Sequence, residues 1–186
     1  YQSALISKEA KHTGFYSEKG QGVEGLFLEW IIKSLKPNGV ANIVLPDGIF
    51  TNIGNQRLHE FIINQCFIEA IISLPINTFF NTPKKTYIMT LRKKRDVEIK
   101  QDYPVFTYYC SSIGESLDVY RFDIDDNDFQ TAVTKYNLFR NCKDKNNIES
   151  YLKPVFDDIR LKFLSIESFK EHSAWDIEKR WNDEEK

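Results

Sequence analysis

The chain has 186 residues, a formal net charge of −2 at pH 7 and a sequence pI of about 6.0. Its 41% hydrophobic and 28% charged residues match an ordinary globular composition and exclude the weakly hydrophobic, highly charged class of disordered chains. The charge balance also lacks the global basic excess that is typical of nucleic-acid-binding domains. Any contact with DNA must therefore come from a local basic patch, or from parts of the protein that this chain does not include.

The cysteines, histidines and apolar runs argue against a metal site, a redox site and a membrane span. The cysteines are widely spaced, without a C-x-x-C pair: Cys66, Cys110 and Cys142. We therefore expect free thiols in a reducing cytoplasm and no zinc or redox site. The scattered histidines have no partner at metal-ligand spacing, so we expect no metal. No apolar run reaches the ~18 residues that span a bilayer, which excludes a membrane partner.

The first 35 residues divide into two parts. Residues 1–22 are polar and glycine-containing, which predicts a loop or strap, and the aromatic pair Phe15 and Tyr16 could anchor it on a surface. From Val23 to Leu35, apolar residues recur at the spacing of an amphipathic helix. The Pro-Asn-Gly turn at 37–39 ends that helix.

Strands and helices then alternate along the chain. The apolar runs 40–45 and 67–74, each bounded by turn residues, predict buried strands of a parallel sheet. A helix is expected at roughly 55–66, and further strands at 87–91 and 104–109. The link before residue 87 shows no helical period, which favours an antiparallel return of that strand. This alternation predicts an α/β fold with a parallel component.

The composition shifts after Cys110. Residues 111–128 are polar and acidic, and aromatic residues at helical spacing predict a helix from Asn127, a good N-cap, to Arg140. A polar linker at 141–150 and a tail at 151–186 follow. We therefore expect a loop or strap at 1–22, an α/β unit at 23–110 and a mainly helical extension at 111–186.

An ordered set of motifs lies between Leu26 and Arg92. It comprises LKPNG at 35–39, IVLPDG at 43–48, EAIISLP at 69–75, the pair Phe79-Phe80 and KKT at 84–86. The set resembles N6-adenine DNA methyltransferases, most closely the modification subunits of type I restriction–modification systems. LKPNG alone is a weak signal, whereas the ordered set is specific. The segment from Ile166 to Trp181, with WDIEKRW, is also similar to the end of such subunits.

The resemblance implies the C-terminal half of a Rossmann-like methyltransferase sheet followed by a mainly helical tail. It implies methyl transfer from S-adenosylmethionine to adenine N6 of DNA, in a complex with specificity and restriction subunits. The family also needs a glycine-rich loop after its first strand and an Asn/Asp-Pro-Pro-Phe/Tyr motif, and this chain has neither. We therefore expect the chain to begin downstream of both motifs and to be inactive by itself, without the main cofactor-binding motif.

The resemblance assigns base stacking to Phe80, with Phe79 as the alternate and otherwise a core residue. The target adenine must swing out of the duplex, and base–aromatic stacking is worth ~1–3 kcal/mol. Periodicity alone would let both phenylalanines plug the end of the sheet.

Charged residues near the strand ends are candidates for DNA or cofactor contact. Lys84 and Lys85 could bind DNA phosphates or form a solvated turn. Arg92 and Lys93 begin a basic run, RKKR, that we expect at the surface, where it either touches DNA or is simply solvated. Asp47 could line the cofactor or base pocket, or cap the next segment.

Three questions stay open from the sequence. Trp175 and Trp181 either dock the tail onto other parts of the protein or a specificity subunit, or form a small satellite core. The chain could also belong to an RNA or small-molecule methyltransferase, or be a non-catalytic DNA-binding or assembly module. Finally, half of a sheet leaves an open strand edge, so we expect the isolated chain to self-associate.

Overall fold

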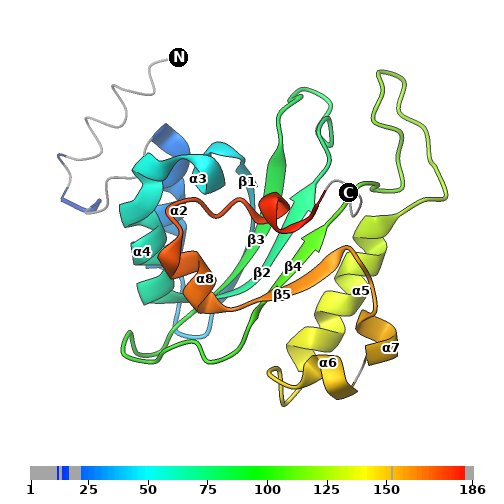
Figure 1. Cartoon of the computed structure of the whole chain (residues 1–186). Coiled ribbons are helices and arrows are strands. Elements are labelled where there is room, and N and C mark those ends of the chain that lie inside the picture. Colours follow the sequence, from blue (N-terminus) through cyan, green and yellow to red (C-terminus); the bar gives the residue numbers. More distant parts are fainter. Residues whose placement is uncertain (1–11, 13, 17–21, 152, 183–186) are drawn as a thin grey trace.

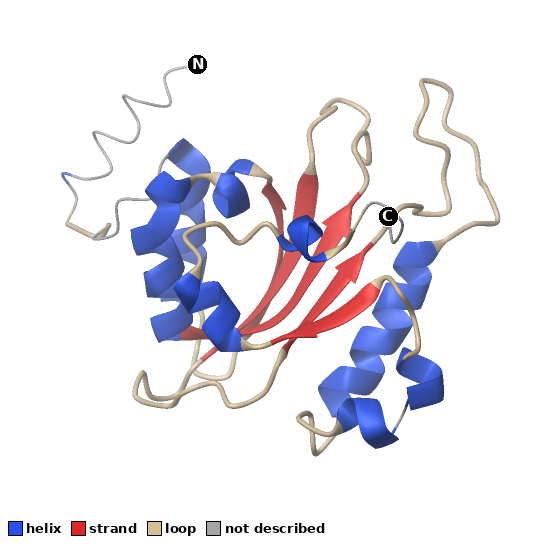
Figure 2. Ribbon diagram, viewed as in Figure 1, coloured by secondary structure: helices blue, strands red, loops and turns tan. Residues whose placement is uncertain are grey.

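A computed structural model describes residues 12, 14–16, 22–151 and 153–182. Most of the strap expected at 1–22 lies outside these residues. The described part contains a five-stranded sheet with helices on both faces (Figures 1 and 2). The strands are β1 (Val40–Pro46), β2 (Cys66–Leu74), β3 (Thr86–Lys93), β4 (Val105–Tyr109) and β5 (Leu161–Leu164).

The helices divide between the two faces of the sheet (Figure 1). One face carries α2 (Gly22–Ser34), α3 (Gly48–Thr51), α4 (Gln56–Gln65) and α8 (Ile166–Glu171). The other carries α5 (Asp128–Asn141), α6 (Ile148–Tyr151) and α7 (Lys153–Phe156). Two short 3-10 turns complete the structure, η1 (Ile53–Asn55) and η2 (Ile177–Arg180). The α/β class is confirmed.

The strand order is β1-β3-β2-β4-β5. β3 runs antiparallel between β1 and β2, as the helix-free link to it predicted, and β2 pairs with β4 in parallel. β5 then adds antiparallel to β4. The carboxyl ends of β1, β2 and β4 therefore meet at one edge of the sheet, which we call the carboxyl edge.

The two strands expected to be buried differ. β2 is central and buried, because its Ile71 faces one hydrophobic cluster while Ala70 and Ile72 face the other. The prediction of a buried parallel strand is wrong for β1. It pairs only with antiparallel β3 within the described residues, and alternate side chains such as Val40 and Val44 are exposed. A short apolar run cannot distinguish these two situations.

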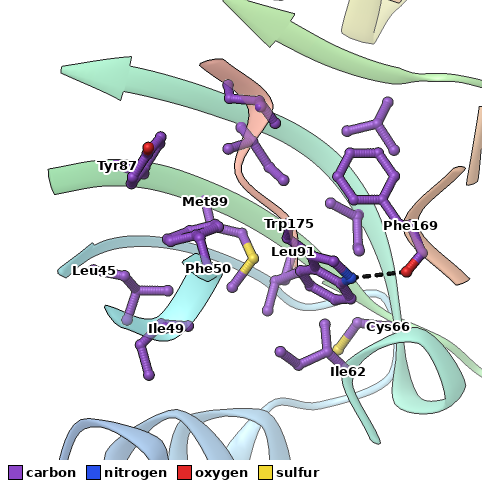
Figure 3. Packing of buried hydrophobic residues seen from close by; sticks show 14 of the residues in the cluster. Leu45, Ile49, Phe50, Ile62, Cys66, Tyr87, Met89, Leu91, Phe169 and Trp175 are labelled. Atoms are coloured by element: carbon purple, nitrogen blue, oxygen red, sulfur yellow. Dashed lines mark hydrogen bonds between the residues drawn. The ribbon is translucent and has the colours of Figure 1, made fainter. Parts of the chain in front are cut away.

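The tail is not only helical. β5 extends the sheet, and the chain then crosses one face through α8 and η2 (Figure 1). Trp175 and Trp181 are buried in the main core cluster, so the satellite-core reading of these tryptophans is wrong. Figure 3 shows the Trp175 indole packed near Leu91 and Ile62, with its N–H donating to the Phe169 carbonyl at 2.8 Å.

Candidate functional site

A pocket of about 400 Å³ opens at the carboxyl edge. Its charged and amide side chains come from four segments: α2, the residue after β1, the turn after α3 and the residues just before β3. The side chains that line it include Glu24, Asp47, Asn52, Asn55, Lys84 and Lys85. Carboxyl ends of strands are where ligands bind in open α/β sheets, so this pocket is the candidate site.

Asp47 is held at the mouth of the pocket by hydrogen bonds of its backbone and of its side chain. Its backbone N–H donates to the Lys85 carbonyl at 3.0 Å, which ties the end of β1 to the start of β3. Its carboxylate accepts from the Thr51 hydroxyl at 3.1 Å and from the Tyr87 hydroxyl at 3.4 Å. It makes no side-chain capping hydrogen bond to α3, so the capping prediction is wrong.

The Lys85 side chain interacts with other residues of this chain. Its ammonium pairs with Glu178 of η2 and lies 5.6 Å from the ring centroids of both Tyr87 and Tyr109. The Ser73 hydroxyl also donates to Glu178. Burial raises the pKa of Tyr87 far above its ordinary value, and Glu178 adds to the effect. This polar cluster joins the tail to the carboxyl edge.

Lys84 differs from its neighbour. It is exposed at the pocket rim, and no ion pair links it to other described residues. Its ammonium is therefore available to an anion from outside the chain, whereas that of Lys85 is already neutralised.

The link between β2 and β3, residues 75–85, forms a loop that we call the Phe80 loop. It projects beyond the carboxyl edge (Figure 1). The Thr82 N–H donates to the Phe79 carbonyl at 2.9 Å, which tightens the turn around Phe80. Phe80 is 67% exposed and Phe79 is 41% exposed. Neither ring plugs the sheet, and the prediction that Phe79 belongs to the core is wrong.

The basic run lies at the opposite end of β3, roughly 24 Å from the carboxyl edge at ~3.4 Å per residue. Arg92 pairs with the buried Glu69, and the Lys93 ammonium donates to Gln65 Oε1 at 2.7 Å. Lys94 is buried and donates to the Ile63 carbonyl at 2.8 Å. The expected surface exposure is therefore wrong for Lys94, and the run is remote from Phe80.

Some residues at this edge escaped the sequence reasoning. Glu178 reaches the site only because the tail returns across the sheet, and no local pattern marks that return. Tyr87 lies at the start of β3, where the sequence predicted a strand but no role at the site. The charged WDIEKRW motif, which contains Glu178, was the one available signal.

None of the strand ends in the described residues carries a glycine-rich loop. Within the same residues, no three His, Cys, Asp or Glu side chains gather as a metal site would require. The helices of the described chain are also too short or too polar to cross a bilayer.

Comparisons with known proteins show the family and the fold of the chain. A family model for N-6 DNA methylases matches residues 3–161. The methylase subunit of the MpnII type I restriction enzyme of Mycoplasma pneumoniae is 38% identical over 73 residues. That match covers 39% of this chain but only 13% of the M. pneumoniae protein.

Two solved structures share the fold. The type I methyltransferase subunit of Streptococcus thermophilus aligns over 95% of this chain and 34% of its own, with a TM-score of 0.58 at 21% identity. A chain of a type I restriction–modification complex aligns over 86% of this chain and 32% of its own, with a TM-score of 0.60 at 15% identity. The chain thus spans about a third of these structures, and its sheet is part of the Rossmann-like fold of methyltransferases. The extent of the family match then settles the relationship: the chain belongs to the N-6 DNA methylase family.

Proposed function

We propose that this chain forms the target-base side of a DNA adenine-N6 methyltransferase in a type I restriction–modification complex. The observation that carries the proposal is Phe80, which is two-thirds exposed on a loop beyond the carboxyl edge. Family membership alone would not require an exposed ring at this place. A large aromatic side chain on a projecting loop is available to a partner without any unpacking of the core.

Phe80 would stack on the adenine after it leaves the duplex. Unstacking a base costs a few kcal/mol, and stacking on an aromatic face returns ~1–3 kcal/mol. Phe79, less exposed and next in the chain, is the alternate platform.

Asp47 and Lys84, which line the pocket, would also help to capture the extruded adenine. The Asp47 carboxylate accepts hydrogen bonds, and an adenine amino group or the amino group of the cofactor is a donor that suits it. Lys84 forms no ion pair with the described residues and lies at the rim, where a DNA phosphate would lie beside an extruded base. Lys85 would act indirectly, by fixing Glu178 and the tail.

S-adenosylmethionine would supply the methyl group when bound, and the remainder of its site would lie outside the described residues. The part assigned to this chain is to hold and orient the adenine, because a well-placed amino group needs positioning more than a strong base. DNA and the specificity and restriction subunits are the partners that this function requires. DNA contact by Arg92 and Lys93 is retained as a separate proposal, at a distance from the base.

The test replaces Phe80 in the natural protein at its full natural length. The genes of the complex are expressed in a host without N6-methyladenine, and sequencing of the native DNA identifies the methylated motif. A duplex with 2-aminopurine at the target position then reports base flipping by its emission. We expect Phe80→Ala to reduce base capture ~5- to ~150-fold, the range that corresponds to one stacking interaction.

Two variants make the result specific. Phe80→Tyr keeps a ring and should retain most of the activity. Ile99→Ala removes an exposed apolar side chain from the link at the opposite end of β3 and should leave methylation unchanged. Unchanged emission and unchanged turnover in Phe80→Ala would refute the proposed role.

A further inference from the structure

A second projection rises beside the Phe80 loop (Figure 1). Residues 114–124, between β4 and α5, form a short hairpin that we call the arm. The Ser116 N–H donates to the Phe122 carbonyl at 2.8 Å, and the Ile124 N–H donates to the Gly114 carbonyl at 3.1 Å. Gly114 has φ +80°, and a Cβ there would lie 2.4 Å from Asn127 Nδ2. This position therefore requires glycine, and the arm has a defined shape.

The base of the arm is anchored to the core. Asp128, buried at the start of α5, accepts hydrogen bonds from the backbone N–H groups of Ser111 and Ser112 at 2.9 and 3.0 Å. It also accepts from the Ser111 hydroxyl at 2.7 Å and pairs with Arg160. These bonds fix the segment from which the arm begins, so that a side chain of the arm can contact the neighbouring Phe80 loop from a defined position.

Arg121 is the side chain that connects the arm to the Phe80 loop. Its Nη2 donates to the backbone carbonyl of Asn77, 44 positions earlier in the chain. Its Nη1 donates to Glu115 Oε2 at 3.1 Å and to the Ser116 carbonyl at 3.3 Å. The Arg121 side chain is only 14% exposed, whereas the adjacent Tyr120 is 90% exposed. Glu115 and Ser116 thus orient the guanidinium toward the loop.

The hydrogen bond from Arg121 lies in the turn of the Phe80 loop that precedes the two phenylalanines. Asn77 has φ +67°, a left-handed conformation in the turn that precedes Phe79 and Phe80. In the projecting part of the loop, residues 75–82, the hydrogen bonds within the loop are local, such as Thr78 to the Pro75 carbonyl and Thr82 to the Phe79 carbonyl. Local bonds shape the turn but do not set its direction relative to the sheet. The long-range, charge-assisted hydrogen bond from Arg121 to the Asn77 carbonyl sets this direction.

We propose that Arg121 is a positioning residue that holds the Phe80 loop in the orientation in which Phe80 receives the extruded adenine. This inference rests on the proposed function of Phe80. Arg121 acts through the Asn77 backbone and touches neither base nor cofactor. Rigid support of this kind matters because a small misplacement of a positioning group is enough to slow a reaction.

The test compares Arg121→Ala and Arg121→Lys in the natural full-length protein. Amide hydrogen exchange of residues 76–82 reads the loop directly, and the 2-aminopurine duplex reads base capture. We expect Arg121→Ala to accelerate exchange and to reduce base capture about tenfold, the loss of one charge-assisted hydrogen bond. S-adenosylmethionine affinity should be unchanged. Arg121→Lys should restore part of both signals, because an ammonium can still donate to the Asn77 carbonyl.

The matched control is Arg140→Ala, which removes an exposed arginine from the last turn of α5 and should change neither signal. Unchanged exchange at residues 76–82 in Arg121→Ala would overturn the positioning role. Faster exchange with undiminished base capture would overturn it as well. If Phe80→Ala leaves base capture unchanged, the proposed function fails, and this inference fails with it. If Phe80→Ala reduces base capture but Arg121→Ala does not, only this inference fails.

Discussion

Glu69 is a carboxylate buried inside the sheet, at 1% exposure. It pairs with Arg92, accepts a hydrogen bond from the Tyr136 hydroxyl at 3.1 Å and lies 4.0 Å from the Lys145 ammonium. Burial raises the pKa of Tyr136, and the nearby Glu69 raises it further. A buried charge with several partners is tolerated, whereas the loss of its main partner is costly.

Arg92→Met should therefore destabilise the fold. We expect a loss of about 2 kcal/mol in the free energy of unfolding, at the low end for a buried pair because the Arg92 side chain is 31% exposed. Arg95→Met is the control, since Arg95 belongs to the same basic run but is exposed. Urea denaturation measures both variants. Equal stability of the two would contradict a structural role for Arg92.

Single residues show which kinds of site the sequence can predict. The motif order placed Phe80 on a link between strands, and the structure finds it exposed there. The sequence could not separate Lys84 from Lys85, because the difference depends on Glu178, which arrives from more than 90 positions away. It also gave no indication that Glu69 engages Arg92, since burial of a charge is decided by the strands around it.

At the level of elements, the tail docks on α4. The Trp175 ring stacks on His59, with centroids 4.0 Å apart and planes 14° apart. The backbone N–H of Trp175 donates to the Phe50 carbonyl at 2.7 Å, and His59 Nε2 donates to the Ile49 carbonyl at the same distance. Burial lowers the pKa of His59, which favours the neutral ring in the folded protein. The tail is thus part of the core.

This contact predicts a pH dependence of stability. The pKa of His59 is lower in the folded state than its ordinary value of 6.5, so unfolding takes up a proton once the pH falls below that value. The contribution of His59 to stability is present above pH 6.5 and is lost as the pH falls toward the folded pKa. The loss is at most about 1.4 kcal/mol per pH unit.

Thermal or urea unfolding between pH 7 and 5 measures the effect. His59→Phe keeps a ring against Trp175 and should flatten the pH dependence, whereas His172→Gln, at an exposed position, should leave it unchanged. The same slope in His59→Phe as in the parent would show that other groups are responsible.

For the whole molecule, the pairing of the sheet leaves β1 with one described neighbour, β3. Val44 on β1 is 50% exposed, and α2 exposes Phe27 and Trp30 to similar degrees. An unpaired strand edge with exposed apolar side chains favours edge-to-edge association. The structure therefore supports the expectation of self-association without testing it.

We predict that the isolated chain forms concentration-dependent dimers or larger species in sedimentation velocity. Val44→Lys should weaken this association, because a lysine on an edge strand opposes pairing with a second edge. Val119→Lys introduces the same charge on the arm, away from β1, and should have little effect. A monomer at every concentration would contradict the prediction.

The sequence by itself determined the α/β class, the antiparallel return of β3 and the motif order of the N-6 DNA methylase family. These properties depend on local periodicity, turn residues and link length, which neighbouring residues encode. The tertiary structure alone decided that β1 lies at an edge, that β5 extends the sheet and that both tail tryptophans enter the main core. It also brought Glu178 to Lys85 and Arg121 to Asn77. Such contacts join distant segments, and burial or pairing at one segment depends on what the rest of the chain places against it.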